Sequence, residues 1–338
     1  MDLANVVANL RRNWDDPSWW RDIVVPFGVR TALVQPYFRH LASNDGVRVL
    51  DEDWDTLLIL DACRYDMFVE HNTIEGDLSR RTSLGSNTEE FLVRNFRGGT
   101  FDDVVYVTAN PQVDVRLDDP FHEVVSVWRD EWDEEFDTVM PDAMADAVRE
   151  AAEAYPNKRI VGHFVQPHYP FVGERGRELL DEQAGIELSR RMADGDEPIA
   201  DHMNVWDMLQ RGLIDERDLR AAYEENLRIA LPHVRTLVED LEGRTVVTSD
   251  HGNLIGERPK PCPVPMELYG HPPGVYADSL VTVPWLTVEG EGRRRIVTGS
   301  ASVADDTASS NDAAAAGAES GQDEDEATDR LRDLGYLE

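Results

Sequence analysis

The sequence of 338 residues is poor in lysine and cysteine and contains no long apolar run. Its lysines are Lys158 and Lys260 alone, and its 33 basic residues stand against 67 acidic ones, for a net charge of −34. Because contacts to phosphate groups need a basic protein face, this balance argues against general nucleic-acid binding. The two cysteines, Cys63 and Cys262, form no CxxC pair, so neither a disulfide framework nor a zinc knuckle is indicated.

Sequence signals for the membrane and for secretion are also absent. No apolar run approaches the roughly 18 residues of a spanning helix, and the N-terminus lacks the basic, apolar and small-residue pattern of a signal peptide. With so little cysteine, these absences predict a soluble, cytoplasmic protein.

The excess of acidic residues, with arginine almost wholly replacing lysine, resembles that of proteins from salt-loving archaea. Molar salt shortens the Debye length to about 3 Å and removes most of the self-repulsion of such a surface. We therefore expect a halophilic protein whose acidic surface reflects its solvent rather than a binding partner.

The two ends of the chain differ in composition from its middle, which predicts a main domain over residues 46–298. Residues 1–45 interleave aromatic residues with arginines, which favours a helical arm packed across this domain; peripheral membrane contact is the alternative. Within the domain, residues 172–217 are polar and irregular and predict an insertion or lid. Residues 299–328 lack aromatics and predict a disordered acidic linker, and residues 329–338 predict a short C-terminal segment that docks back.

Segments rich in β-branched residues alternate with helical patterns through the main domain. The predicted strands are 55–60, 104–108, 124–128, 159–165, 245–248 and 280–288, and the predicted helices include 141–155 and 219–241. Such alternation predicts an α/β fold, with a mostly parallel central sheet flanked by helices.

Two of these strands run into acidic residues. One leads into Asp61, and the other leads into Asp250 and His251. A carboxylate at the end of a buried strand is costly unless it is paired or binds a cation, so these three residues are candidate metal ligands. Gly252 would permit the turn that Asp250 and His251 need if both are to reach one ion. A solvated loop is the alternative for this second strand end.

A segment of small and hydroxylated residues, 85–88, precedes a helical pattern, so Asn87 or Thr88 falls at a helix N-terminus. An ordinary N-cap is one interpretation. The other is a nucleophilic hydroxyl, placed where the helix dipole and free N–H groups stabilise a phosphate or sulfate group. Ser86 is the rival nucleophile to Thr88.

Three histidines extend the candidate site. His168 lies between two prolines beyond a strand end, which favours a role in a pocket, whereas His163 lies inside the strand and is interpreted as a core histidine. His271 follows His251 by 20 residues in a constrained loop and could return to the same crevice; a surface position is the alternative.

Taken in order, four motifs resemble the alkaline phosphatase superfamily, and within it the branch of sulfatases and phosphoglycerol or phosphoethanolamine transferases. The motifs are DACRYD at 61–66, GSNT at 85–88, PHYPF at 167–171 and SDHG at 249–252. The resemblance implies an alkaline-phosphatase-like three-layer sandwich over the main domain.

The resemblance also implies one divalent ion, for which Mn, Zn, Mg and Ca all suit the ligand types. Asp61, Asp250 and His251 would hold this ion, which would also touch Thr88, the nucleophile. His168 would contact the transferred group or protonate the leaving oxygen. Additional candidate contacts to metal or substrate are His271, Arg64 and Ser86.

Two departures from the family pattern bear on the nucleophile and on the number of metal ions. Neither Cys63 nor Cys262 lies in the CxPSR pattern from which sulfatases mature formylglycine. Gln166 stands where two-metal members place an acid, so a second metal ion is not expected.

The expected function is a metal-dependent hydrolase or transferase that acts on phosphate monoesters or diesters through a covalent intermediate on Thr88. A glycan or a lipid-linked compound would carry the ester. The alternatives are a sulfatase that uses an unmodified hydroxyl and a member of the fold that binds a ligand without turnover.

Overall fold

A seven-stranded sheet forms the centre of the protein, in strand order β2-β11-β8-β1-β7-β3-β4. The computed structural model describes residues 14, 15, 17, 20–42, 44–179, 204–298 and 316–336. The strands of this sheet are β1 (Thr56–Leu60), β2 (Asp77–Thr82), β3 (Phe101–Thr108), β4 (Phe121–Ser126), β7 (Arg159–Phe164), β8 (Arg244–Thr248) and β11 (Thr282–Glu289). They run parallel except for β11, which is antiparallel to β2 and β8.

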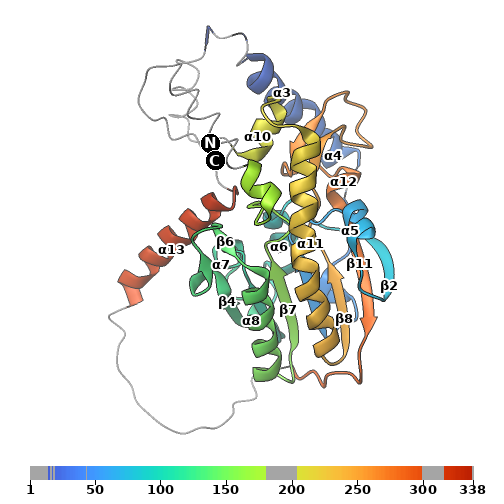
Figure 1. Cartoon of the computed structure of the whole chain (residues 1–338), viewed down its shortest axis with the longest axis vertical. Coiled ribbons are helices and arrows are strands. Elements are labelled where there is room, and N and C mark those ends of the chain that lie inside the picture. Colours follow the sequence, from blue (N-terminus) through green and yellow to red (C-terminus); the bar gives the residue numbers. More distant parts are fainter. Residues whose placement is uncertain are drawn as a thin grey trace.

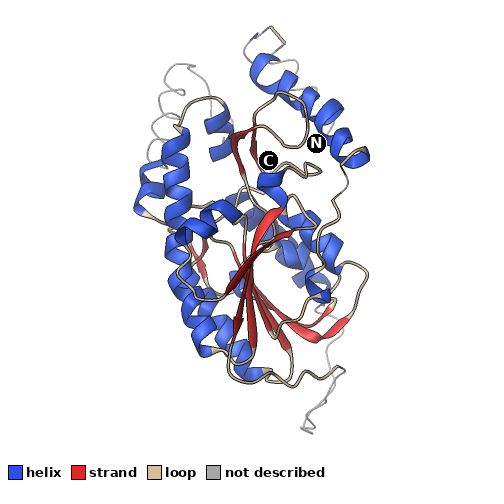
Figure 2. Cartoon of the chain, turned by 90° about the vertical axis from the view of Figure 1, so that its right-hand side faces the viewer, coloured by secondary structure: helices blue, strands red, loops and turns tan. Residues whose placement is uncertain are grey.

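Helices cover both faces of this sheet, as Figure 2 shows. The α-helices that follow the arm in the described residues are α5 (Tyr65–His71), α6 (Thr88–Phe96), α7 (Gln112–Arg116), α8 (Pro141–Ala154), α10 (Val205–Gln210), α11 (Glu216–Asp240), α12 (Asp278–Val281) and α13 (Ala316–Asp333). The helices α8 and α11 pack against each other in front of the sheet in Figure 1, and α11 continues through Pro232 as one helix. The predicted α/β fold with three layers is confirmed.

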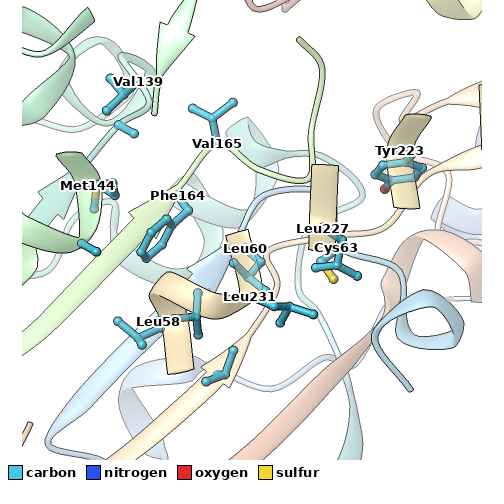
Figure 3. Packing of buried hydrophobic residues seen from close by; sticks show 14 of the residues in the cluster. Leu58, Leu60, Cys63, Val139, Met144, Phe164, Val165, Tyr223, Leu227 and Leu231 are labelled. Atoms are coloured by element: carbon cyan, nitrogen blue, oxygen red, sulfur yellow. The ribbon is translucent and has the colours of Figure 1, made fainter. Parts of the chain in front are cut away.

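Strand β1 shows how the sequence builds these layers. Its Thr-Leu-Leu-Ile-Leu segment is buried throughout, and successive side chains point to opposite faces of the sheet. Leu58 and Leu60 join the apolar cluster under α8 and α11, where they lie near Phe164 and Leu231 (Figure 3). Leu57 and Ile59, which point to the other face of the sheet, pack with α6 instead. After Thr56, this strand, which is buried on both faces, is therefore apolar to its end.

In the described residues, four short strands and two 3-10 turns lie outside the main sheet. The antiparallel pairs are β5 (Trp132–Asp133) with β6 (Thr138–Val139), and β9 (Leu254–Glu257) with β10 (Leu268–Gly270). Single 3-10 turns are formed by Val49–Asp51 and Val127–Arg129. The second of these turns shortens the strand predicted at 124–128, because β4 already ends at Ser126.

The N-terminal arm is helical over residues 20–40 of the part that the structure describes. It consists of π-helical and α-helical segments, in the order Trp20–Val24, α3 (Val25–Val29), Arg30–Val34 and α4 (Gln35–His40). Val34 and Phe38 pack into an apolar cluster with Val275 and Leu280. The amide of Gln35 also donates a hydrogen bond to the carbonyl oxygen of Pro273, 2.8 Å away. The arm thus packs on the loop that follows β10.

The region predicted as an irregular insertion is partly helical. Residues 174–179 form a helical turn, and α10 begins after Asn204, whose side chain caps it. Residues 180–203 lie outside the described residues, so the lid hypothesis remains a prediction.

The C-terminal part corrects the expected extent of the disordered linker. Residues 316–328 belong to α13, because alanine favours a helix and Ala327 and Leu331 pack into the main apolar cluster. Residues 299–315 lie outside the described residues. None of the described helices combines the length and hydropathy of a membrane-spanning segment.

Candidate active site

The carboxyl ends of two neighbouring strands deliver the acidic residues to one place. β1 and β8 are adjacent and parallel, with Ile59 opposite Thr248, so Asp61 and Asp250 leave the sheet side by side. One ligand atom from each, together with one from His251, lies within 4.8 Å of the others. All three side chains are fully buried. The predicted ligand group therefore comes together in the folded chain.

Tight turns hold these three side chains in place. Ala62 adopts a left-handed backbone with φ of 59°, which is unusual for a residue with a Cβ, and its N–H donates to Asp250 Oδ1 at 3.0 Å. Gly252 approaches the next segment so closely that a Cβ there would overlap the carbonyl oxygen of Ser279. The turn after β8 therefore requires glycine at this position.

The orientation of His251 is set by its other ring nitrogen. Its Nδ1 donates to the carbonyl oxygen of Gly252 at 2.7 Å, so Nε2 is the ring nitrogen that faces the carboxylates. This Nε2 lies 3.5 Å from Asp61 Oδ1 and 3.4 Å from Asp250 Oδ2. It therefore points into the space between the two carboxylates.

Thr88 is the first residue of α6, and its hydroxyl faces this carboxylate pair. The cap of the helix is Asn87, whose side chain accepts the N–H of Glu90 at 2.8 Å. Thr88 Oγ1 lies 3.4 Å from both oxygens of Asp61 and 3.2 Å from Nε2 of His251. The cap and the candidate nucleophile are thus two different, adjacent residues.

Ser86 and Arg64, two other candidate site residues, form their hydrogen bonds and ion pairs away from the carboxylate pair. The hydroxyl of Ser86 donates to Glu90 at 2.9 Å and to the carbonyl oxygen of Pro272 at 3.2 Å. Arg64 is buried and forms ion pairs with Asp66, at 2.8 Å, and with Glu257 at 2.5 Å. Both residues stabilise the loops around the site.

The electrostatics of the buried carboxylates favour a cation. Burial and the neighbouring Asp250 raise the pKa of Asp61 well above its ordinary value. Burial also opposes ionisation of Asp250, but His251 and His163 hold the pKa of this carboxyl below its ordinary value. Asp250 Oδ2 and the Nε2 atoms of His163 and His168 are buried without a hydrogen-bond partner. An electron-rich set of atoms with unsatisfied lone pairs is what a divalent cation would satisfy.

Two of the predicted histidines line the same space. His168 Nδ1 donates to the carbonyl oxygen of Tyr169 at 2.6 Å, which leaves the lone pair on Nε2. The rings of His168 and His271 lie 5.0 Å apart, and His271 lies 4.9 Å from His251. Burial lowers the pKa of His168 to about 4, so its ring is neutral near pH 7.

Three residues that the sequence did not place in the site also reach it. Asn110 follows β3 and donates to Asp61 Oδ2 at 2.9 Å. His163, interpreted as a core histidine, is buried but lies 3.9 Å from an oxygen of both Asp61 and Asp250. Tyr336, beyond α13, donates its hydroxyl hydrogen to Asp61. Asn110 comes just after strand β3, so a search for polar residues at strand ends would have found it. No local sequence signal indicated His163 or Tyr336.

Gln166, at the position where the resemblance led us to expect an acid in a two-metal protein, is buried just beyond β7. Its Nε2 donates to the carbonyl oxygen of Val139 at 3.0 Å, and its Oε1 has no hydrogen-bond partner. The number of metal ions remains a prediction.

Neither a protein-family model nor a curated protein sequence matches this chain. Several solved structures do match it in fold. The soluble domain of lipooligosaccharide phosphoethanolamine transferase A from Neisseria meningitidis matches with 12% identity and a TM-score of 0.41, over 69% of this chain and 75% of that chain. This match reports a likeness in fold alone.

Two further matches agree with this. Phosphonate monoester hydrolase from Silicibacter pomeroyi matches with 14% identity and a TM-score of 0.41, over 72% of this chain and 69% of that chain. A protein in the alkaline phosphatase superfamily from Vibrio parahaemolyticus matches with 10% identity and a TM-score of 0.35, over 72% of this chain and 62% of that chain. Because these overlaps are loose, the chemistry of this chain is argued from its own site.

Proposed function

We propose that this protein hydrolyses or transfers the phosphoryl group of phosphate esters, with Thr88 as nucleophile. The observation that carries the proposal is the position of Thr88 Oγ1, which lies 3.4 Å from both oxygens of Asp61 and 3.2 Å from His251. A hydroxyl at a helix N-terminus, next to buried metal-ligating groups, has the surroundings that an oxygen nucleophile needs.

The residues around Thr88 fit a divalent ion. Asp61, Asp250 and His251 would hold it through two kinds of donor, carboxylate oxygen and imidazole nitrogen, which suit Mn, Zn, Mg or Ca. Such an ion, when bound, lowers the pKa of the attacking hydroxyl and neutralises charge on the phosphoryl oxygens. The unsatisfied Asp250 Oδ2 is the atom that most needs this partner.

The chain itself supplies the remaining functions. The first N–H groups of α6 have no partner within the helix and would stabilise phosphoryl oxygens at Thr88. Attack by the Thr88 oxygen forms a bond to phosphorus and breaks the bond to the ester oxygen, which departs as the alcohol. Water or an acceptor alcohol then displaces Thr88. His168 is neutral near pH 7 with its lone pair on Nε2, which favours contact with a donor on the transferred or accepting group.

The two cysteines support an unmodified hydroxyl. Cys63 lies in the loop after β1 and Cys262 in the loop after β9, and both are buried. Neither stands at the N-terminus of α6, where the nucleophile is proposed. The geometry thus favours Thr88 over chemistry based on a matured cysteine.

The test uses the purified full chain in molar KCl, stripped with EDTA and reloaded with each candidate metal ion. The substrates are p-nitrophenyl phosphate, bis(p-nitrophenyl) phosphate and p-nitrophenyl sulfate. We expect turnover on a phosphate ester that depends on added metal. Turnover on the sulfate alone would establish the sulfatase alternative. No turnover and no bound metal by elemental analysis would leave a ligand-binding protein.

The nucleophile is tested by Thr88→Ala, which should lower kcat by a factor on the order of 10³ or more. Thr88→Ser keeps a hydroxyl and should retain most of the activity. Ser86→Ala is the matched control, since its hydroxyl bonds Glu90 rather than Asp61. An acid-quenched reaction should carry a phosphoryl group on the peptide that contains Thr88. Full activity of Thr88→Ala would refute the assignment.

A further inference from the structure

Tyr336, which follows α13, reaches the centre of the candidate active site. Its hydroxyl donates to Asp61 Oδ2, and the Nδ2 of Asn110 donates to the Tyr336 oxygen at 3.0 Å. The same oxygen lies 3.5 Å from Thr88 Oγ1. The phenol ring stacks on His168, with centroids 4.6 Å apart and planes 17° apart. The proposed reaction gives this side chain no role.

The phenol oxygen occupies the place that a substrate needs. A nucleophile and the atom that it attacks lie about 3–3.5 Å apart before reaction, and Tyr336 holds this distance from Thr88. The other close neighbours of the Thr88 hydroxyl are Asp61 and His251. Thr88 is 0% exposed, as is Asp61. A phosphate ester therefore cannot reach the nucleophile while Tyr336 is in place.

The segment that carries Tyr336 is held by a small set of contacts. Leu331 and Leu334 are buried in the main apolar cluster. Arg330 forms an ion pair with Glu134 at 2.8 Å, and its guanidinium lies 4.6 Å from the ring centroid of Trp132. These contacts are made by one short stretch near the end of the chain, and the helix α13 lies at the side of the domain in Figure 1.

We propose that residues 327–336 form an autoinhibitory plug, in which Tyr336 competes with the phosphate ester for the space beside Thr88. This inference rests on the proposed function of Thr88. Substrate binds only to the open form, so the apparent KM rises in inverse proportion to the fraction of open molecules, and kcat at saturation stays the same.

The kinetic test opens the plug without touching the site. Arg330→Glu in the full chain repels Glu134 and removes the cation from Trp132. Because the open form is the minor one in the wild-type chain, this change should lower KM for p-nitrophenyl phosphate by about tenfold or more at unchanged kcat. Arg332→Glu is the matched control: it makes the same charge change on the same helix, at a side chain that is 56% exposed, and should leave KM unchanged.

Tyr336→Ala removes the competing group and should lower KM in the same way. An unchanged KM in both Arg330→Glu and Tyr336→Ala would overturn the proposal. A large loss of kcat in Tyr336→Ala would also overturn it, because the phenol would then take part in the chemistry.

A structural readout separates this inference from the proposed function. Hydrogen exchange of the amides in 327–336 is followed in the wild-type chain, before and after addition of Mn²⁺ with inorganic phosphate. Displacement of the plug should accelerate exchange in this segment, whereas Arg330→Glu should exchange rapidly from the start. Unchanged exchange in the presence of both additions would contradict the plug. Absence of turnover on every ester, together with accelerated exchange, would refute the proposed function and keep the plug.

Discussion

At the scale of single residues, the buried histidines are notable because they remain neutral. Burial lowers the pKa of both His163 and His168 to about 4. The Nδ1 of His163 is paired with the hydroxyl of Tyr106 at 2.9 Å, and His168 bonds the backbone of Tyr169. Neutral imidazoles with free lone pairs can accept hydrogen bonds or bind cations at neutral pH, but they make the fold sensitive to acid.

The acid sensitivity of His168 can be measured. Its folded pKa of about 4 lies below the ordinary 6.5, so the unfolded chain binds the extra proton between these values. Its contribution to stability is fully present above pH 6.5 and is lost as the pH falls through about 4, by up to roughly 3 kcal/mol. His168→Gln should flatten the dependence of unfolding free energy on pH in this window. Denaturant titrations in molar KCl with EDTA check this; parallel pH profiles would contradict it.

Some residues of the site could be predicted from the sequence and others could not, depending on how the fold brings them together. Asp61, Asp250 and His251 could be predicted because an apolar strand that ends in an acid is recognisable from local sequence. Tyr336 could not, because it lies 275 residues from Asp61 and meets it only through the docking of α13. His163 could not be assigned either, since a buried histidine in a strand has the same sequence signature whether it faces core or site.

At the scale of secondary-structure elements, α11 positions the segment that carries His168. This segment contains prolines, which lack an N–H, and its carbonyl groups find a donor in Asn226 of α11. Asn226 Nδ2 donates to the carbonyl oxygen of His168 at 2.9 Å, and its Oδ1 accepts the N–H of Val172 at 3.0 Å. One buried side chain thus fixes the loop from both sides.

Asn226→Leu should destabilise the protein strongly. It leaves buried backbone groups of the 167–172 segment without partners, at about 1–3 kcal/mol for each group. It should also raise KM, because His168 is no longer held in place. Arg228→Ala, on the exposed face of the same helix, is the control and should change stability by less than about 0.5 kcal/mol. Denaturant unfolding measures the stability of both variants, and equal midpoints would show that Asn226 does not hold the 167–172 segment in place.

The pattern of elements was more accessible to prediction than their directions and ends. Alternating strands and helices indicated the parallel sheet, because each strand buried on both faces is a continuous apolar run. The reversed direction of β11 leaves no trace in its own sequence; it follows from pairing with β2 and β8. The extent of α13 was missed because its composition alone suggested disorder, and the leucines that dock it come at its very end.

At the scale of the whole molecule, two electrostatic effects of salt oppose each other. Surface ion pairs such as Asp53 with Arg293, at 2.6 Å, weaken in salt, but each contributes only about 0–1 kcal/mol. A net charge of −34 produces repulsion among many acidic groups across the surface, and salt screens this as well. Because the charge is so unbalanced, the relief of repulsion should exceed the loss of the ion pairs.

We therefore expect the protein to become more stable as salt is added. Between about 0.1 M and about 1 M KCl the Debye length falls from about 10 Å to about 3 Å, and the unfolding midpoint should rise by roughly 10 °C. Sucrose at equal osmolality is the control, since it is excluded from protein surfaces but screens no charge. A similar rise in sucrose would assign the effect to solvent exclusion, and a midpoint that falls in KCl would mean that the ion pairs outweigh the repulsion.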